Sequence, residues 1–192
     1  ANRLFVEEKI FDKFLKKLVV RIKKLKVGNG FEKSDVGPLI SEKAIKKIKN
    51  HIDDALSKGG EILIGGKKSK IGKLFFEPTI VTNINKSMKI FSNENFGPII
   101  PVIKFKSDDE LIQLANDTNY GLAAYFYTKK ASRVWKIIEN LEYGMLGINS
   151  GKISSYLNPF GGLKESGVGR EGSIQCLEPF LETKFVSWSY DD

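Results

Sequence analysis

The sequence predicts an α/β fold, and two observations lead to this expectation. Segments whose apolar residues recur with a helical period alternate with short runs rich in β-branched and aromatic residues. The 192 residues, 41% of them hydrophobic, are enough for one sizeable core, and no internal repeat or low-complexity tract interrupts the chain.

The first helix is predicted over residues 7–26, where the apolar side chains form a stripe with helical spacing. Residues 27–30, Val-Gly-Asn-Gly, end it. Ser41 is the predicted N-cap of a second helix, whose apolar stripe runs to the terminating pair Gly59-Gly60. A β-rich run at residues 61–64 follows at once, so helix and strand succeed each other as in an αβ unit.

The middle of the chain continues this alternation. Pro78 lies within the β-rich residues 75–83, which indicates an edge strand or an extended connection, because proline cannot donate a ladder hydrogen bond. Ser107 and Glu110 match the reciprocal capping pattern of a helix start. The remaining predicted elements of this part are strands at residues 98–105, 122–128 and 144–148 and a helix at residues 131–141.

Composition changes to glycine, serine and proline over residues 150–172, which predicts a long structured loop. Loops of this length in a compact domain are usually functional or disordered, and the aromatic and apolar residues here favour a functional loop. A short helix at residues 174–181 and a last strand at residues 184–188 complete the prediction.

The net charge of +8, from 31 basic and 23 acidic residues, raises the question of a polyanionic partner. The lysines are densest on the polar sides of the first two helices, without interleaved aromatic or arginine side chains. We therefore interpret them as solvated helix faces and expect no nucleic-acid binding. They are Lys13, Lys16, Lys17, Lys23, Lys24, Lys43, Lys46, Lys47 and Lys49.

Composition also bounds the compartment. No apolar run approaches the roughly 20 residues that span a bilayer, and the first residues lack the pattern of a secretory signal, so we expect no membrane association. The single cysteine, Cys176, excludes an intramolecular disulfide and a cysteine-rich zinc site. We expect no metal site and a cytoplasmic location, because a lone cysteine fits a reducing compartment.

Three features that often carry chemistry favour structural interpretations here. Gly167, Gly169 and Gly172 have G-x-G-x-x-G spacing, but no buried strand precedes them, so a tight loop is favoured over a dinucleotide-binding loop. His51, the only histidine, lies beside the apolar stripe of its helix and is interpreted as a boundary or exposed residue rather than a catalytic base. Cys176 is interpreted as a packing residue rather than a nucleophile.

The segment Glu94-Asn95-Phe96-Gly97-Pro98 places a carboxylate and an aromatic ring together before a predicted strand. This pair is able to bind a ribose. On the residues alone, a solvated loop glutamate beside a core phenylalanine is the favoured interpretation, and the binding interpretation stays open.

Several motifs together resemble the aldehyde dehydrogenase superfamily, from Asn2-Arg3 almost to the C-terminus. Glu94-x-Phe96-Gly97-Pro98 resembles that family's nicotinamide-ribose motif, and residues 119–122, Asn-Tyr-Gly-Leu, resemble its usual segment after the following helix. Residues 159–171 resemble its C-terminal signature. The stretch from residue 147 to residue 173 is similar to the succinate-semialdehyde dehydrogenase branch of the family.

This resemblance implies site residues and a cofactor. Glu94 and Phe96 would bind the nicotinamide riboside of NAD or NADP, Ser154 would hydrogen-bond a substrate carboxylate, and Phe160 would form an apolar wall of the aldehyde tunnel. The family oxidises aldehydes through a cysteine thiohemiacetal and a glutamate-activated water. By the resemblance, that cysteine and that general-base glutamate lie upstream of Ala1, so we expect no catalytic residue in this chain and no activity from it alone.

The resemblance also implies an architecture. We expect a three-layer catalytic domain over residues 1–172 and an oligomerisation tail over residues 173–192. Within the tail, the strand at residues 184–188 would pair with a partner subunit's sheet, giving a homo-dimer or homo-tetramer. Asn93 departs from the second acidic residue that many members have there.

Two other functions remain as alternatives. The first is another aliphatic aldehyde dehydrogenase, of the lactaldehyde, glycolaldehyde or betaine-aldehyde type. The second is a non-catalytic basic interaction module that binds polyanions, whose affinity would fall steeply with salt.

Overall fold

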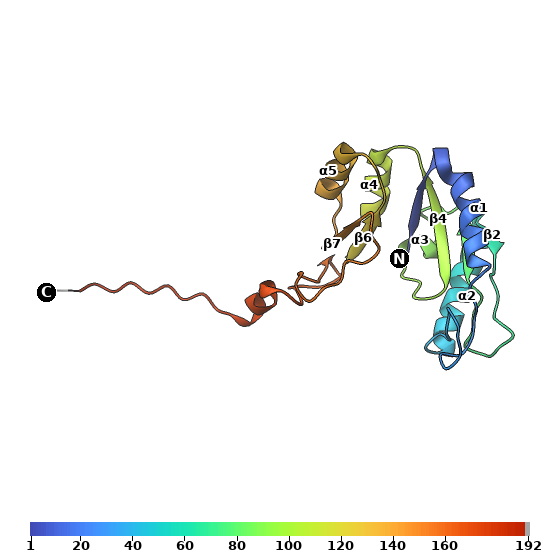
Figure 1. Ribbon diagram of the computed structural model, residues 1–192, viewed down its shortest axis with the longest axis horizontal. Helices are drawn as coiled ribbons and strands as arrows, with labels where there is room; N and C mark the ends of the chain where they lie inside the picture. The colour runs from blue at the N-terminus through green and yellow to red at the C-terminus, as the bar shows by residue number, and fades with distance from the viewer. Residues whose placement is uncertain (191–192) are drawn as a thin grey trace. The chain divides into compact units, whose positions relative to one another are not determined.

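The computed structural model describes residues 1–190 and divides the chain into two units, Ala1–Leu114 and the residues from Ala115 onward (Figure 1). Within residues 1–190, unit 1 has one four-stranded sheet and unit 2 has two two-stranded sheets. Among the described residues, no helix is long and apolar enough to cross a membrane.

Unit 1 is built on a four-stranded sheet in the order β1-β4-β3-β2. β1 (Leu4–Glu7), β4 (Ile99–Phe105) and β3 (Thr79–Thr82) run parallel, while β2 (Glu61–Ile64) pairs antiparallel with β3. β3 and β4 have partners on both sides, so they form the middle of the sheet.

Helices cover both faces of this sheet. α1 (Phe11–Ile22) packs on one face together with Ile80, whereas α2 (Glu42–Ser57) packs on the other together with Val81. Neighbouring residues of β3 thus point to opposite faces, as the strand period of two requires. The expected three-layer α/β arrangement is therefore confirmed.

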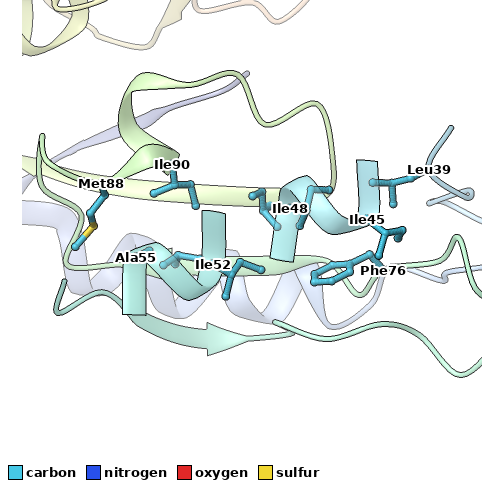
Figure 2. Close-up of a cluster of buried hydrophobic side chains, with 10 residues drawn as sticks. Leu39, Ile45, Ile48, Ile52, Ala55, Phe76, Met88 and Ile90 are labelled. Atoms are coloured by element: carbon cyan, nitrogen blue, oxygen red, sulfur yellow. The ribbon is translucent and has the colours of Figure 1, made fainter. Parts of the chain in front are cut away.

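Figure 2 shows the core between α2 and the sheet. Ile45, Ile48 and Ile52 lie one helical turn apart on α2 and are at most 2% exposed. They pack against Phe76 and Ile90, which come from the loop before β3 and from the one-turn helix α3 (Lys89–Ser92). The apolar stripe that predicted α2 is thus the stripe that is buried.

Several local predictions are confirmed at the residue level. Ser41 is the N-cap of α2, and its Oγ accepts a hydrogen bond from the backbone N–H of Ala44 at 3.2 Å. Ser107 Oγ accepts from the N–H of Glu110 at 3.2 Å at the start of α4 (Asp108–Asn116), whereas Glu110 Oε2 accepts from the N–H of Lys106 rather than from that of Ser107, so the first half of the capping pattern is confirmed. The N-terminal helix prediction corresponds to a short 3-10 turn, η1 (Glu8–Ile10), followed by α1.

Unit 2 contains a β-α-β unit and a long loop. β6 and β7 pair in parallel, and α5 connects them. β5 and β8 form a short antiparallel pair that ties the loop to the segment after α4. The elements are β5 (Tyr120–Gly121), β6 (Ala123–Phe126), α5 (Ala131–Asn140), β7 (Met145–Ile148), β8 (Leu163–Lys164) and the 3-10 helix η2 (Ile174–Phe180).

Two expectations about strands need correction. The segment around Pro78 is not an edge strand, because β3 lies between β4 and β2. Pro78 precedes the strand's first residue, Thr79, so its missing N–H breaks no ladder bond. The predicted strand at residues 184–188 is absent from the described single chain, which has no regular secondary structure from Leu181 to Tyr190.

The physical reason for the second difference is that a strand exists only through backbone pairing, and these residues have no partner strand within the described chain. Pairing with a second subunit stays a prediction. The boundary at residue 172 between the catalytic domain and the oligomerisation tail also stays a prediction. The last two residues of that tail, 191 and 192, lie outside the described part of the chain.

Candidate functional site

The loop between α3 and β4 presents the two residues expected to bind a cofactor. Glu94 is exposed, and Phe96 is 79% exposed with a φ of 51°. The interpretation of Phe96 as a core residue is therefore wrong. A non-glycine residue in the left-handed region is uncommon, and it turns the chain sharply into Gly97 and Pro98.

Close packing beneath this loop explains Gly97. A Cβ added there would lie 2.0 Å from Ile48 Cδ1 on α2 and 3.4 Å from Leu39 Cδ2. An alanine there would push the Ile48 side chain aside, whereas glycine lets the backbone lie against the helix without that shift. The loop is consequently held against the core of unit 1 while its side chains at 94 and 96 face outward.

A buried polar group fixes the same loop from its centre. His51 and Asn95 are 4% and 3% exposed, and His51 Nδ1 lies 2.8 Å from Asn95 Oδ1. His51 is therefore not the boundary or exposed residue predicted from its helix pattern. His51 is buried because the loop covers this side of α2.

In unit 2, a pocket of about 400 Å³ contains both residues expected to contact substrate. Ser154 and Phe160 lie on its wall. Ser154 is exposed, and its Oγ has no hydrogen-bond partner among residues 1–190. The full lining is Gly144, Met145, Leu146, Lys152, Ile153, Ser154, Ser155, Asn158, Pro159 and Phe160.

Lys152 is the charged residue in this lining, and it is not among the site residues that the family resemblance implies. It is exposed, two positions before Ser154. Ser150 Oγ holds its backbone by accepting from the Lys152 N–H and donating to the Lys152 carbonyl, both at 3.2 Å. A cation and a hydroxyl donor on one wall suit an anionic ligand group.

Backbone and arginine contacts give the pocket loop its shape. Phe160 and Glu171 exchange backbone hydrogen bonds of 2.8 and 2.6 Å, which close the loop into a ring. Arg170 donates from Nη1 to the carbonyls of Gly162, at 3.0 Å, and Gly169, at 2.7 Å. The predicted long loop is therefore ordered by its own contacts together with the short β5–β8 pairing.

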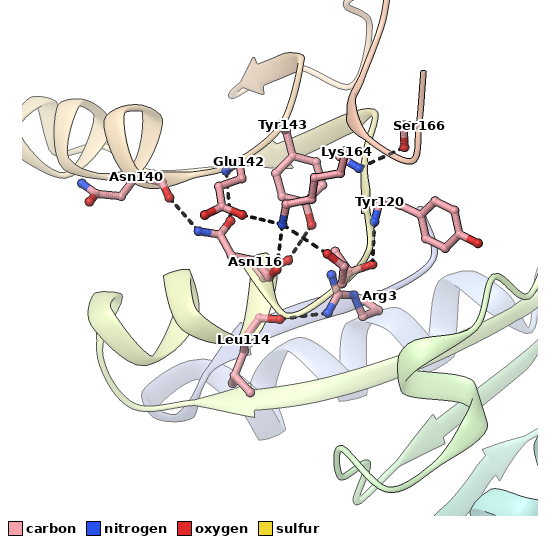
Figure 3. Close-up of polar contacts among 12 residues, drawn as sticks. Arg3, Leu114, Asn116, Tyr120, Asn140, Glu142, Tyr143, Lys164 and Ser166 are labelled. Atoms are coloured by element: carbon pink, nitrogen blue, oxygen red, sulfur yellow. Dashed lines mark hydrogen bonds and ion pairs between the residues drawn. The ribbon is translucent and has the colours of Figure 1, made fainter. Parts of the chain in front are cut away.

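Polar contacts anchor this loop to the rest of unit 2 (Figure 3). Lys164 Nζ forms an ion pair with Glu142 and donates to the carbonyls of Asn116, at 3.0 Å, and Thr118, at 3.2 Å. Ser166 Oγ accepts from the N–H of Gly121 at 2.9 Å. The C-terminal signature thus has a structural half, which anchors the loop, and a half that lines the pocket.

The structure places the four expected site residues as two pairs. Glu94 and Phe96 share one loop of unit 1, and Ser154 and Phe160 share one pocket of unit 2. Cys176 is half-buried on η2 and is not among the pocket residues. Within residues 1–190, no three histidine, cysteine or acidic side chains are grouped closely enough to hold a metal ion.

Comparison with known proteins identifies the family of this chain. A family model described as "Aldehyde dehydrogenase family" matches residues 1–186. The chain belongs to the aldehyde dehydrogenase family.

Individual family members show how close the match is. The chain is 48% identical, over 187 residues, to a protein of Oryza sativa subsp. japonica named mitochondrial succinate-semialdehyde dehydrogenase; the match covers 97% of this chain and 36% of the relative. A crystal structure of succinate-semialdehyde dehydrogenase from Burkholderia pseudomallei superposes with a TM-score of 0.90 at 50% identity, covering 93% of this chain and 37% of that one.

A more distant family member was crystallised with NAD⁺. It is betaine aldehyde dehydrogenase from Staphylococcus aureus, with a TM-score of 0.89 and 39% identity over 95% of this chain and 37% of that one. The present chain thus spans well under half the length of each of these aldehyde dehydrogenases.

The residues of unit 1 fit the nucleotide cofactor that an aldehyde dehydrogenase requires. Glu94 has no partner among the described residues, so its carboxylate is available to accept hydrogen bonds from ribose hydroxyls. The exposed ring of Phe96 offers a flat apolar surface beside it. The tightly held backbone between them keeps the two groups at a fixed spacing.

Proposed function

We propose that this chain is part of an NAD- or NADP-dependent aldehyde dehydrogenase that oxidises succinate semialdehyde to succinate. The observation that supports this most directly is the pocket of unit 2, which contains Lys152, Ser154 and Phe160 together. The resemblance implies that Ser154 and Phe160 bind substrate. Both share this pocket with the cation Lys152, although the sequence pattern did not require it.

Each pocket residue has a distinct role in the proposal. Ser154 Oγ donates a hydrogen bond to the substrate carboxylate, and Lys152 attracts the same negative charge. Phe160 is partly buried and supplies an apolar wall, which excludes water from the reacting end of a short aldehyde. Together they orient a molecule that is anionic at one end and apolar along its chain.

Unit 1 supplies the cofactor side of the proposal. NAD or NADP, when bound, accepts the hydride released from the aldehyde carbon. Glu94 would accept hydrogen bonds from the ribose hydroxyls, and Phe96 would contact the nicotinamide riboside. Their part is to orient the cofactor, since neither side chain takes part in bond making.

By the family resemblance, the nucleophilic cysteine and the general-base glutamate lie outside residues 1–192. We therefore expect the isolated chain to have no turnover, and protein expressed from its complete reading frame to be active. Intact mass, measured on the same preparation as NAD- and NADP-dependent turnover of succinate semialdehyde, separates a whole enzyme from an inactive piece.

Replacing Ser154 with alanine tests the substrate assignment. Loss of a hydrogen bond to a charged group should raise the Michaelis constant for succinate semialdehyde by about tenfold, while that for butyraldehyde, which has the same carbon chain without the carboxylate, changes little. The measurement is steady-state formation of reduced cofactor by protein expressed from the complete reading frame.

Ser155→Ala is the matched control, because Ser155 Oγ already accepts from the N–H of Leu157 at 3.3 Å within the loop. We expect it to affect both aldehydes alike. Equal effects of Ser154→Ala on the two aldehydes would remove the carboxylate assignment. Lys152→Met should weaken the carboxylated substrate only, and added salt should shrink its effect, because the lysine is exposed.

The alternative within the family is oxidation of another short aldehyde, such as lactaldehyde, glycolaldehyde or betaine aldehyde. Betaine aldehyde carries a positive charge, which Lys152 would repel. A higher kcat/KM for betaine aldehyde than for succinate semialdehyde would therefore favour this alternative. The interaction-module alternative predicts salt-sensitive binding to heparin without turnover, and its support is limited to exposed lysines on α1 and α2.

A further inference from the structure

Two buried polar residues that the proposed chemistry does not use, a histidine and an asparagine, meet where α2 packs against the loop between α3 and β4. His51 comes from α2 and Asn95 from the loop, and the two are 44 positions apart in the sequence. Both are almost fully buried, and 2.8 Å separates His51 Nδ1 from Asn95 Oδ1. Buried polar side chains are retained only where they are paired, since an unpaired one costs free energy.

A second asparagine holds Asn95 from the other side. Asn2, two positions before the first residue of β1, accepts a hydrogen bond from the backbone N–H of Asn95 through its Oδ1 at 2.8 Å. Asn2 Nδ2 donates to the carbonyl of Asn93 at 3.1 Å, and Asn95 Nδ2 reaches the Asn2 carbonyl at 3.5 Å. The loop is therefore bound to the start of the sheet by both its backbone and its side chains.

The orientation of the Asn95 amide sets the role of His51 in this contact. The amide nitrogen is oriented toward the Asn2 carbonyl and the amide oxygen toward the imidazole. An amide oxygen only accepts, so in this orientation His51 donates from Nδ1. A specific donor at position 51 is thus part of how the loop is held.

Asn95 stands between the two residues of the cofactor pair. Its side chain points inward to His51, whereas Glu94 and Phe96 on either side are exposed. Turning Asn95 out of its buried site would displace the backbone that it shares with both neighbours, because the three residues are consecutive in one short loop and Phe96 already lies at a sharp turn. The direction of Glu94 and Phe96 consequently depends on the inward bond of Asn95.

We propose that His51 is a positioning residue for cofactor binding, acting through its hydrogen bond to Asn95 to orient Glu94 and Phe96. This inference rests on the proposed function, because it takes Glu94 and Phe96 to bind NAD or NADP. It adds a residue on α2 that touches neither cofactor nor substrate.

Two substitutions at position 51 separate positioning from simple packing. His51→Asn places an amide nitrogen where Nδ1 lies but leaves space where the ring was. His51→Leu fills more of that space but has no donor. Both variants should lose some thermal stability, the first through a cavity and the second through the unpaired Asn95 oxygen.

The Michaelis constant for the cofactor distinguishes the two variants. In protein expressed from the complete reading frame, His51→Leu should raise the constant for NAD or NADP by roughly fivefold, the size of one lost hydrogen bond, with little change in that for the aldehyde. His51→Asn should keep a cofactor constant close to that of the unchanged protein despite its lower stability.

The outcomes distinguish this inference from the function on which it rests. Absence of NAD- and NADP-dependent aldehyde oxidation by the unchanged protein would overturn the proposed function. An active protein in which His51→Leu and His51→Asn shift both Michaelis constants equally, or lower stability alone, would overturn the positioning role and leave the function standing.

Discussion

The carboxylate of Asp54 on α2 links the end of that helix to the start of α3. Its Oδ1 pairs with Lys58 Nζ at 2.8 Å, one turn along the same helix, and its Oδ2 accepts the backbone N–H of Lys89, the first residue of α3, at 2.7 Å. The hydrogen bond from Lys58, followed by that from Lys89, holds the pKa of Asp54 below its ordinary value of 3.8.

This pKa shift predicts how stability depends on pH. A depressed carboxyl pKa stabilises the folded state fully above the unfolded-state value, and that contribution is lost as pH falls through the folded-state pKa. Asp54→Ala should therefore lower the free energy of unfolding by about 1 kcal/mol at neutral pH, and by progressively less in acid. Urea unfolding at neutral pH and at about pH 3 checks this, with Asp53→Ala, exposed on the same helix, as control. A loss that stays constant between the two pH values would contradict the ionic origin of the effect.

Single residues also show which parts of the site can be predicted from the sequence. Ser154 and Phe160 were expected from the family resemblance, and the structure places both in one pocket. His51, Asn95 and Lys152 were not, because their roles depend on what the fold places beside them. The signal available for Lys152 was its position two residues before Ser154, which keeps its charge close to an expected substrate residue.

At the scale of elements, the packing of the loop between α3 and β4 against α2 leads to a second prediction. Gly97→Ala would bring a methyl group against Ile48 Cδ1, and overpacking of this kind costs about 1 to 3 kcal/mol. Ile48→Val removes that particular atom. The double variant should therefore be more stable than the sum of the two single changes implies, as thermal unfolding of the four proteins would show. Strictly additive changes would mean that the loop relaxes away from α2.

The elements themselves were largely predictable, because helix stripes and caps are local signals. α2 begins at the capping residue Ser41 as expected, and the two parallel strands β6 and β7 flank the predicted helix α5. The position of β3 inside the sheet was not predictable from Pro78, since strand order is a long-range property. The 3-10 geometry of η2 also escaped the pattern, which indicates only that a helical turn is present.

For the whole molecule, the segment after η2 bears on assembly. Phe185 and Trp188 are 89% and 83% exposed, and exposed apolar side chains in a row commonly mark an interface. If this segment pairs with the sheet of a second subunit, Val186→Pro should lower the mass in solution by removing one backbone donor. Val186→Thr keeps both the N–H and the β-branched shape and serves as control. Light scattering on protein from the complete reading frame measures the mass, and an unchanged mass for Val186→Pro would contradict pairing through this segment.

The parallel pairing of β1 with β4 has a consequence for synthesis on the ribosome. Leu4 lies opposite Val102, so β1 and β4 pair only after nearly all of unit 1 has been made. Until then, the apolar side chains of β1 and α1 that later pack on the sheet stay uncovered. Parallel pairing across such a sequence distance is slow to form, so the nascent chain passes through a period in which binding by a chaperone, or aggregation, competes with folding.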